Sequence, residues 1–199
     1  MAYQFDRAKP FYALVMTYLI SLHGLKELLA IGLLGNDRMW NLQNREGSAA
    51  DMAEIQRGMD KLLGPLELRV AGDTDKITVS VESIAAEFVQ NSYLIEHQTK
   101  AAHALLAAAY EATHGKPYQD QGPQWEFLRH CRNAAAHNGR FHFKDAEPRR
   151  PARWRTIEIL RSMHGEPLLV QSDGSGHLQL GDPVVLLWDI EQAYPAITM

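Results

Sequence analysis

The sequence predicts a mainly α-helical protein, with a helical bundle over residues 1–147 and a small C-terminal extension with short strands over residues 148–199. Three observations support this. Hydrophobic residues recur at helical spacing through most of the first 138 residues. After residue 148 the pattern changes to short stretches separated by glycine and serine, which is typical of hairpins. The composition, 46% hydrophobic and 22% charged over 199 residues, is that of a globular protein with a sizeable core.

A first helix is predicted to begin near Asp6 and to end within residues 32–35. The Asp6 side chain can cap its first turn, and Pro10 suits that turn because proline lacks a backbone donor. Its apolar positions recur three and four apart: Phe11, Leu14, Val15, Tyr18, Leu22, Leu25 and Leu29.

A polar loop over residues 36–48 and a second helix over residues 51–63 are expected next. Residues 66–70 and 76–81 alternate apolar and polar side chains around a turn rich in glycine and aspartate. This pattern predicts a small hairpin lying on the helices.

The longest helical pattern covers residues 83–113, and a further helix is predicted from Pro123 to about residue 138. Gly139 suits the left-handed position just past a helix end. Four helices with short to moderate links favour a bundle.

The extension contains three strand-like stretches, at residues 154–160, 167–170 and 178–180. The last apolar stretch, residues 183–194, fits either a strand or a helix, and its period does not decide between them.

Composition excludes several classes of protein. The single cysteine, Cys131, rules out an internal disulfide framework and a cysteine-based zinc site, and it favours a reducing compartment, the cytoplasm. The apolar run over residues 11–22 is too short to span a bilayer, so no membrane association is expected.

Positive charge is concentrated in residues 129–161, where nine lysines or arginines stand against three acidic residues. The whole chain carries a formal net charge of −4, so any binding of nucleic acid must be local. The basic segment indicates either a cationic surface for an anionic ligand or a merely solvated face.

The most informative motif is Arg132-Asn-Ala-Ala-Ala-His137, followed by Asn138-Gly139, at the end of the last predicted bundle helix. The sequence contains no phosphate-binding glycine loop, hydrolase elbow, dinucleotide fingerprint or helical His-Glu-x-x-His zinc motif. The arginine, the polar residue after it and the histidine resemble the Arg-x4-6-His motif of the HEPN superfamily.

This resemblance covers roughly residues 11–143. It implies a homodimeric helical bundle and a metal-independent endoribonuclease of a toxin or phage-defence type, which leaves a 2′,3′-cyclic phosphate and a 5′-hydroxyl. An antitoxin or regulatory protein is a possible partner. HEPN toxins that pair with a nucleotidyltransferase antitoxin typically carry a tyrosine two residues after the histidine. Gly139 stands there in this chain, so that form of control is not implied.

The chemistry of these residues is consistent with RNA cleavage. Arg132 offers a fixed positive fork to a phosphoryl oxygen, His137 can move a proton, and Asn133 can orient the imidazole or bind phosphate. Residues 132 and 137 diverge by roughly 140° on a regular helix, so one copy alone does not easily aim both at one phosphate. A two-fold dimer can line one cleft with both residues from each chain.

Structural roles are open for the same residues. Arg132 can pair with a carboxylate such as Glu126 or Glu96, and His137 can bond a carbonyl as part of the helix cap. No metal or other cofactor is expected, because His142 can approach His137 but two histidines without a nearby carboxylate make a poor zinc site.

Four further residues are candidates for contacting RNA: Arg129, Asn138, Arg140 and His142. Phe141 and Phe143 can stack on bases or belong to the core. The functional expectation is a cytoplasmic, homodimeric, metal-independent endoribonuclease. The alternative is a catalytically silent HEPN module that binds a nucleotide, RNA or a protein partner.

Overall fold

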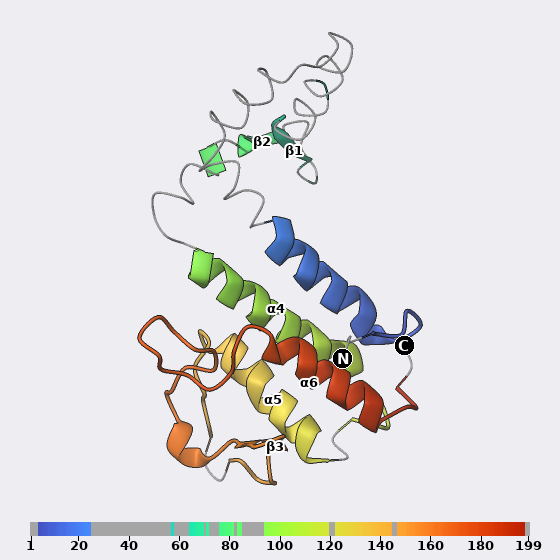
Figure 1. Ribbon diagram of the computed structural model, residues 1–199, viewed down its shortest axis with the longest axis vertical. Coiled ribbons are helices and arrows are strands. Elements are labelled where there is room, and N and C mark those ends of the chain that lie inside the picture. The colour runs from blue at the N-terminus through green and yellow to red at the C-terminus, as the bar shows by residue number, and fades with distance from the viewer. Residues whose placement is uncertain are drawn as a thin grey trace, which may run out of the picture. The chain divides into compact units, whose positions relative to one another are not determined.

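The computed structural model (Figure 1) describes residues 4–24, 57, 64–69, 71, 76–81, 83–84, 94–119, 122–144 and 147–197. These residues are mainly helical, as predicted. The chain divides into two compact units. One contains Met1–Leu22 and Ile95–Met199, and the other contains His23–Leu94. None of the described helices combines the length and hydropathy that a transmembrane span requires.

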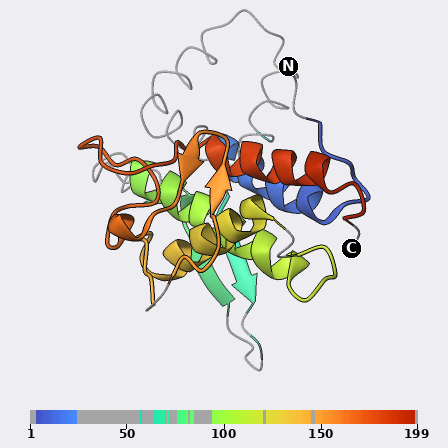
Figure 2. The ribbon, with the colours of Figure 1, turned by 90° about the horizontal axis from the view of Figure 1, so that it is seen from below.

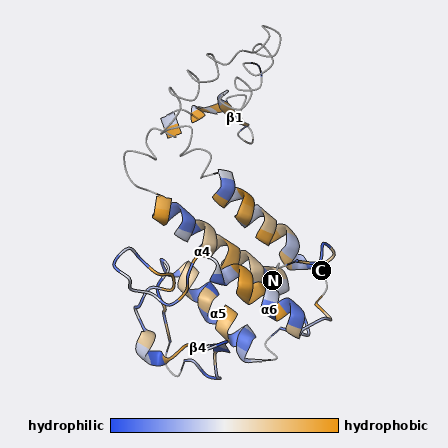
Figure 3. Cartoon of the chain, in the orientation of Figure 1, coloured by the Kyte–Doolittle hydropathy of each residue, from blue (hydrophilic) through white to orange (hydrophobic). Residues whose placement is uncertain are grey.

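The N-terminal helix begins at residue 10 and is described to residue 24. Its start follows the prediction, since the Ala8 N–H donates to Asp6 Oδ1 at 2.9 Å and Pro10 occupies the first helical position. Three of the predicted apolar positions, Phe11, Val15 and Tyr18, are buried. Figure 3 shows hydrophobic residues alternating with hydrophilic ones along this helix.

Helix α4 (Leu94–Thr113) confirms the later part of the helix predicted over residues 83–113, of which residues 85–93 lie outside the described residues, and helix α5 (Pro123–Ala136) confirms the helix predicted from Pro123. The buried positions of α4 recur at helical spacing, and proline stands in the first turn of α5. The two helices are antiparallel, because His103 of α4 lies against Gly139 while Glu111 of α4 contacts Arg132 of α5.

Helix α6 (Asp182–Ala193) settles the choice that the period of residues 183–194 leaves open. It lies beside the N-terminal segment (Figure 2), where the Asp6 N–H donates to Glu191 Oε1 and the Phe5 ring lies 6.3 Å from Trp188. The described bundle of this unit therefore includes a helix from the C-terminal extension.

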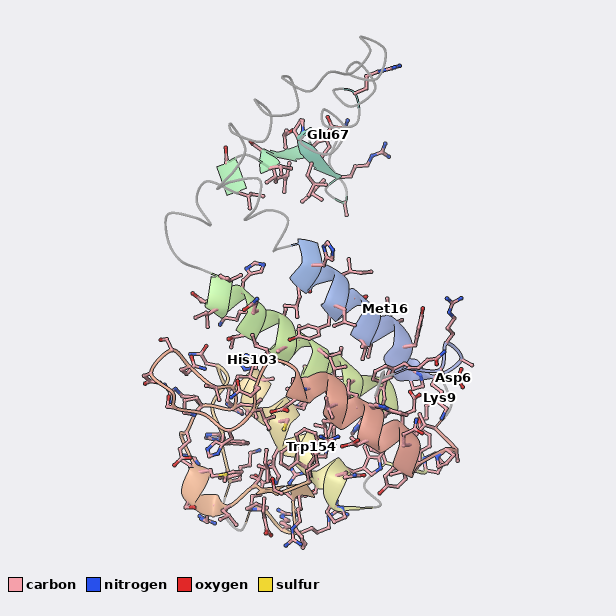
Figure 4. The ribbon with its side chains drawn as sticks, viewed as in Figure 1. Asp6, Lys9, Met16, Glu67, His103 and Trp154 are labelled. Atoms are coloured by element: carbon pink, nitrogen blue, oxygen red, sulfur yellow. The ribbon has the colours of Figure 1, made fainter. Side chains whose placement is uncertain are left out.

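The rest of the extension packs on α5. Strands β3 (Arg153–Trp154) and β4 (Ile157–Glu158) form an antiparallel pair inside the predicted 154–160 stretch. Trp154 lies between α5 and α6 (Figure 4), with its ring 5.8 Å from Phe127 and its indole N–H donated to Asp189 at 2.8 Å. The 3-10 helix η1 (Arg161–Met163) follows.

The stretches at 167–170 and 178–180 make only isolated bridges. Residues 148–197 belong to the same compact unit as α4 and α5, so the predicted boundary after residue 147 does not coincide with the division into units.

In the other unit, β1 (Leu66–Arg69) pairs with β2 (Lys76–Val79) in antiparallel register, which confirms the predicted hairpin. The predicted loop over 36–48 lies outside the described residues, as does the helix over 51–63 apart from residue 57.

Candidate functional site

The predicted motif lies at the end of α5, where the chain reverses direction. The His137 N–H still donates to the carbonyl oxygens of Asn133 and Ala134, at 3.1 and 3.0 Å. Asn138 and Gly139 then adopt positive φ angles of 55° and 74°. This pair of left-handed residues ends the helix, as the sequence predicts for Gly139, and leaves the His137 side chain exposed.

The C-terminal extension holds the segment that follows this turn. The Leu168 N–H donates to the Gly139 carbonyl at 2.8 Å. Phe141 exchanges backbone hydrogen bonds with Glu166 and Gly165, at 3.0 and 2.8 Å. The extension therefore holds residues 139–143 in place. The family resemblance seen in the sequence does not cover this extension.

Three exposed histidine rings form a row, called here the histidine stack: His137, His142 and His164. The rings of His137 and His142 are stacked, with centroids 4.4 Å apart and planes at 28°. The His164 ring lies on His142 at 5.3 Å, and its Nδ1 accepts the Phe143 N–H at 3.1 Å. Since Nδ1 accepts, the proton of the neutral His164 ring is on Nε2.

The phenylalanines beside the stack belong to the core. Phe141 and Phe143 are 2% and 7% exposed, and their rings stack on each other at 5.9 Å. Of the two roles open to them, stacking on bases or filling the core, the structure supports the second. Alternation along residues 141–143 therefore turns His142 outward while its neighbours point inward.

Arg132 pairs with Glu111 of α4, so the expected partners Glu126 and Glu96 are wrong. Its Nε lies 2.9 Å from Glu111 Oε1, and its guanidinium carbon lies 5.8 Å from the Tyr110 ring centroid. The Arg132 and Glu111 side chains are 37% and 52% exposed. An ion pair this exposed contributes about 0.2–1 kcal/mol, so Arg132 is available to an anionic ligand.

Asn133 faces Arg132, whose Nη1 donates to the Asn133 Oδ1 at 3.4 Å. Within the described part of the chain, no hydrogen bond joins the His137 ring to either Arg132 or Asn133. In a single copy the Arg132 side chain therefore lies against α4, whereas the His137 ring belongs to the histidine stack.

Arg129, a candidate for contacting RNA, is engaged in a charged network. It donates to both carboxylate oxygens of Glu126, at 2.7 and 3.1 Å, and to Glu147 at 2.9 Å. Burial alone would raise the pKa of Glu126, but the hydrogen bond and charge of Arg129, with the charges of His130 and Arg150, hold that pKa below its usual value.

The other three candidates for contacting RNA are exposed: Asn138, Arg140 and His142. Arg140 Nη1 donates to the Gly165 carbonyl at 2.8 Å, and the Asn138 side-chain oxygen lies 3.4 Å from Lys100 Nζ. All three lie on the turn or the segment that follows it, next to His137 in the chain.

Cys131 is fully buried and packs as a small hydrophobic side chain. Burial raises the pKa of its thiol well above the usual range. Among the described residues, no group of three or more His, Cys, Asp or Glu side chains has an arrangement that could hold a metal ion.

Sequence reasoning missed His164, Glu111 and His103. The sequence does contain one signal for a cluster of histidines: eight of the nine lie between residues 97 and 177. No family model, curated protein or solved structure matches the chain.

Proposed function

We propose that the end of α5 is the site of a metal-independent endoribonuclease of HEPN type that acts as a homodimer. One observation carries this proposal: His137 is exposed at the helix end, in a row of histidines, in the same motif as an arginine whose charge is paired with Glu111 at the exposed surface. A proton carrier and a cationic fork are both groups that cleavage of RNA without a metal uses.

Each residue has a distinct role in the proposal. Arg132 binds a nonbridging phosphate oxygen and stabilises the charge that develops there, exchanging Glu111 for the phosphate. His137 transfers a proton at the ribose 2′-oxygen or the leaving 5′-oxygen. Asn133, bonded to Arg132, orients the guanidinium.

The homodimer explains how Arg132 and His137 serve one phosphate. Within one chain no hydrogen bond among the described residues links them, whereas a two-fold contact between α5 helices brings the arginine of one copy near the histidine of the other. The setting we propose is cytoplasmic toxin or phage-defence activity, with a regulatory protein as partner.

The test is cleavage of single-stranded RNA in the presence of a chelator by the parent protein and by His137→Ala. The matched control is His114→Ala, which removes an exposed histidine just after the C-terminal end of α4. We expect the parent and the control to leave 2′,3′-cyclic phosphate ends and His137→Ala to lose activity. Undiminished cleavage by His137→Ala contradicts the proposal, and RNA binding without cleavage by the parent supports the silent module instead.

A further inference from the structure

We propose that His142 is the second proton-transfer residue of this site and that it acts together with His137 of the same chain. The inference rests on the proposed ribonuclease function and deepens it, because His142 lies outside the motif that suggests that function. It assigns a catalytic role to a residue that sequence analysis treats only as a contact for RNA.

The reaction itself requires a second group. As the 2′-oxygen forms its bond to phosphorus, its proton passes to a neutral imidazole. As the bond between phosphorus and the 5′-oxygen breaks, an imidazolium gives its proton to that oxygen. The products are a 2′,3′-cyclic phosphate and a 5′-hydroxyl, and water returns both rings to their starting protonation states. One imidazole cannot be base and acid in the same step.

The geometry supplies that second imidazole beside the first. His137 and His142 are both exposed, and their rings are stacked with centroids 4.4 Å apart. The attacking and leaving oxygens of an in-line displacement belong to one phosphodiester. Two adjacent ring edges can each reach a different one of these oxygens.

The fold fixes the position of His142. Its neighbours Phe141 and Phe143 are buried, which anchors the backbone on both sides. The His164 ring lies 5.3 Å from the His142 ring, and its Nδ1 accepts the Phe143 N–H. His164 is therefore a positioning residue, supplied by the C-terminal extension.

The charged surroundings suit a phosphate. Arg140 lies two residues before His142, its Nη1 donates to the Gly165 carbonyl at 2.8 Å, and its positive charge helps to lower the pKa of the Asp173 carboxyl. Glu166, an acidic side chain of the extension, lies 2.6 Å from His177 Nε2 and is paired with that ring.

The first experiment compares two substrates, a dinucleoside monophosphate and the 4-nitrophenyl ester of uridine 3′-phosphate, with purified full-length His137→Ala, His142→Ala and the control His114→Ala. On the dinucleotide we expect both site variants to lose at least about 100-fold in kcat/KM, the usual contribution of general acid–base catalysis. On the ester, 4-nitrophenolate leaves without a proton, so the variant that lacks the acid recovers most of its activity and the other does not.

This result also assigns which ring is the acid. His142→Ala with parental activity on the dinucleotide overturns the inference while leaving the proposed function intact. The inference also fails if His137→Ala and His142→Ala recover activity to the same extent when the ester replaces the dinucleotide. A parent protein that cleaves neither substrate overturns the proposed function and the inference with it. Circular dichroism of each variant establishes that it is folded.

A second experiment tests whether the two rings act in one chain. His137→Ala and His142→Ala are co-expressed with different tags, and the mixed dimer is purified through both tags. Each copy then lacks one ring, so we expect no recovery over the separate variants. Recovery of a substantial fraction of the parental activity places the two rings in different copies and overturns the inference.

Discussion

Gly139 lies directly against the imidazole of His103, so close that a methyl group in place of its α-hydrogen would come 2.3 Å from His103 Cε1. The contact joins the turn after α5 to the middle of α4, where Figure 4 labels His103. Glycine is required there twice, because its φ of 74° also disfavours any residue with a Cβ. The position of His137, two residues earlier, depends on this turn.

Gly139→Ala is expected to lower the free energy of unfolding by about 2–5 kcal/mol, since left-handed backbone strain costs roughly 1–2 kcal/mol and overpacking roughly 1–3 kcal/mol. Urea denaturation measures this loss. Adding His103→Ala removes the clash but not the strain, so the double variant should lose less stability than the two single losses added together. Strictly additive losses would show that the two residues do not interact.

In the unit that contains Met1–Leu22 and Ile95–Met199, the sequence predicted those helices whose ends are marked by a capping residue, a proline or a glycine. Asp6 and Pro10 mark one start, Pro123 marks another, and Gly139 marks an end, and each of these signals acts through the backbone alone. Helix α6 could not be assigned because its apolar run, Val-Val-Leu-Leu-Trp, fits both periods. Packing on the N-terminal segment and α5 decides its state.

The site was predicted less completely, because its contacts depend on how distant elements pack. Arg132 pairs with Glu111 instead of Glu96 or Glu126 since antiparallel packing brings that turn of α4 opposite it. His164 reaches the stack only because its segment pairs with residues 139–143. No pattern in the neighbouring sequence predicts either contact, whereas the motif can be recognised from the sequence alone.

Arg132→Ala is expected to reduce RNA cleavage about 10²–10³-fold, as removal of a group that stabilises transition-state charge does elsewhere. Arg132→Lys should recover little, because an ammonium lacks the planar fork of the guanidinium. Initial rates on a labelled RNA measure both. The control is Arg153→Ala, which removes an arginine from another exposed ion pair, with Glu158. Parental activity in Arg132→Ala would rule out its proposed role.

Glu111→Gln removes the charge that pairs with Arg132 and tests whether this ion pair competes with an anionic ligand for the guanidinium. We expect a change in unfolding free energy below about 1 kcal/mol, because exposed pairs contribute little. The affinity for RNA should rise, because the Arg132 guanidinium no longer has to give up the Glu111 carboxylate before it binds a phosphate. Fluorescence anisotropy with a labelled oligonucleotide measures affinity, and Glu158→Gln serves as the control. A large loss of stability would show instead that this pair is structural.

Glu126→Gln is expected to lower the free energy of unfolding by about 3 kcal/mol, the low end for breaking a buried pair, because Arg129 is 21% exposed. The pKa of Glu126 is lowered in the folded state, so its stabilisation is present above the usual value of 4.5 and is lost as pH falls through the lowered value. Urea denaturation at pH 7 and in acid should therefore show the difference between parent and variant shrinking. A difference independent of pH would contradict this.

Glu191 behaves in the opposite sense. It is 1% exposed, its Oε1 accepts the Asp6 N–H at 3.2 Å, and its Oε2 has no partner among the described residues. Burial raises its pKa above the usual 4.5, so the folded state binds the proton more tightly than the unfolded state. The ionised carboxylate therefore destabilises the fold at high pH, and that penalty is relieved as pH falls through the raised value towards 4.5.

Glu191→Gln keeps an acceptor for the Asp6 N–H and removes the titration. Relative to this variant, the parent should gain stability as pH is lowered from 8 to about 5, a trend that thermal melts at several pH values measure directly. Glu158→Gln, on an exposed strand residue, controls for general effects of pH on the remaining charges. If the parent instead loses stability relative to Glu191→Gln on acidification, the buried carboxylate is stabilised in its charged form by a contact with the N-terminal segment, and burial does not dominate its titration.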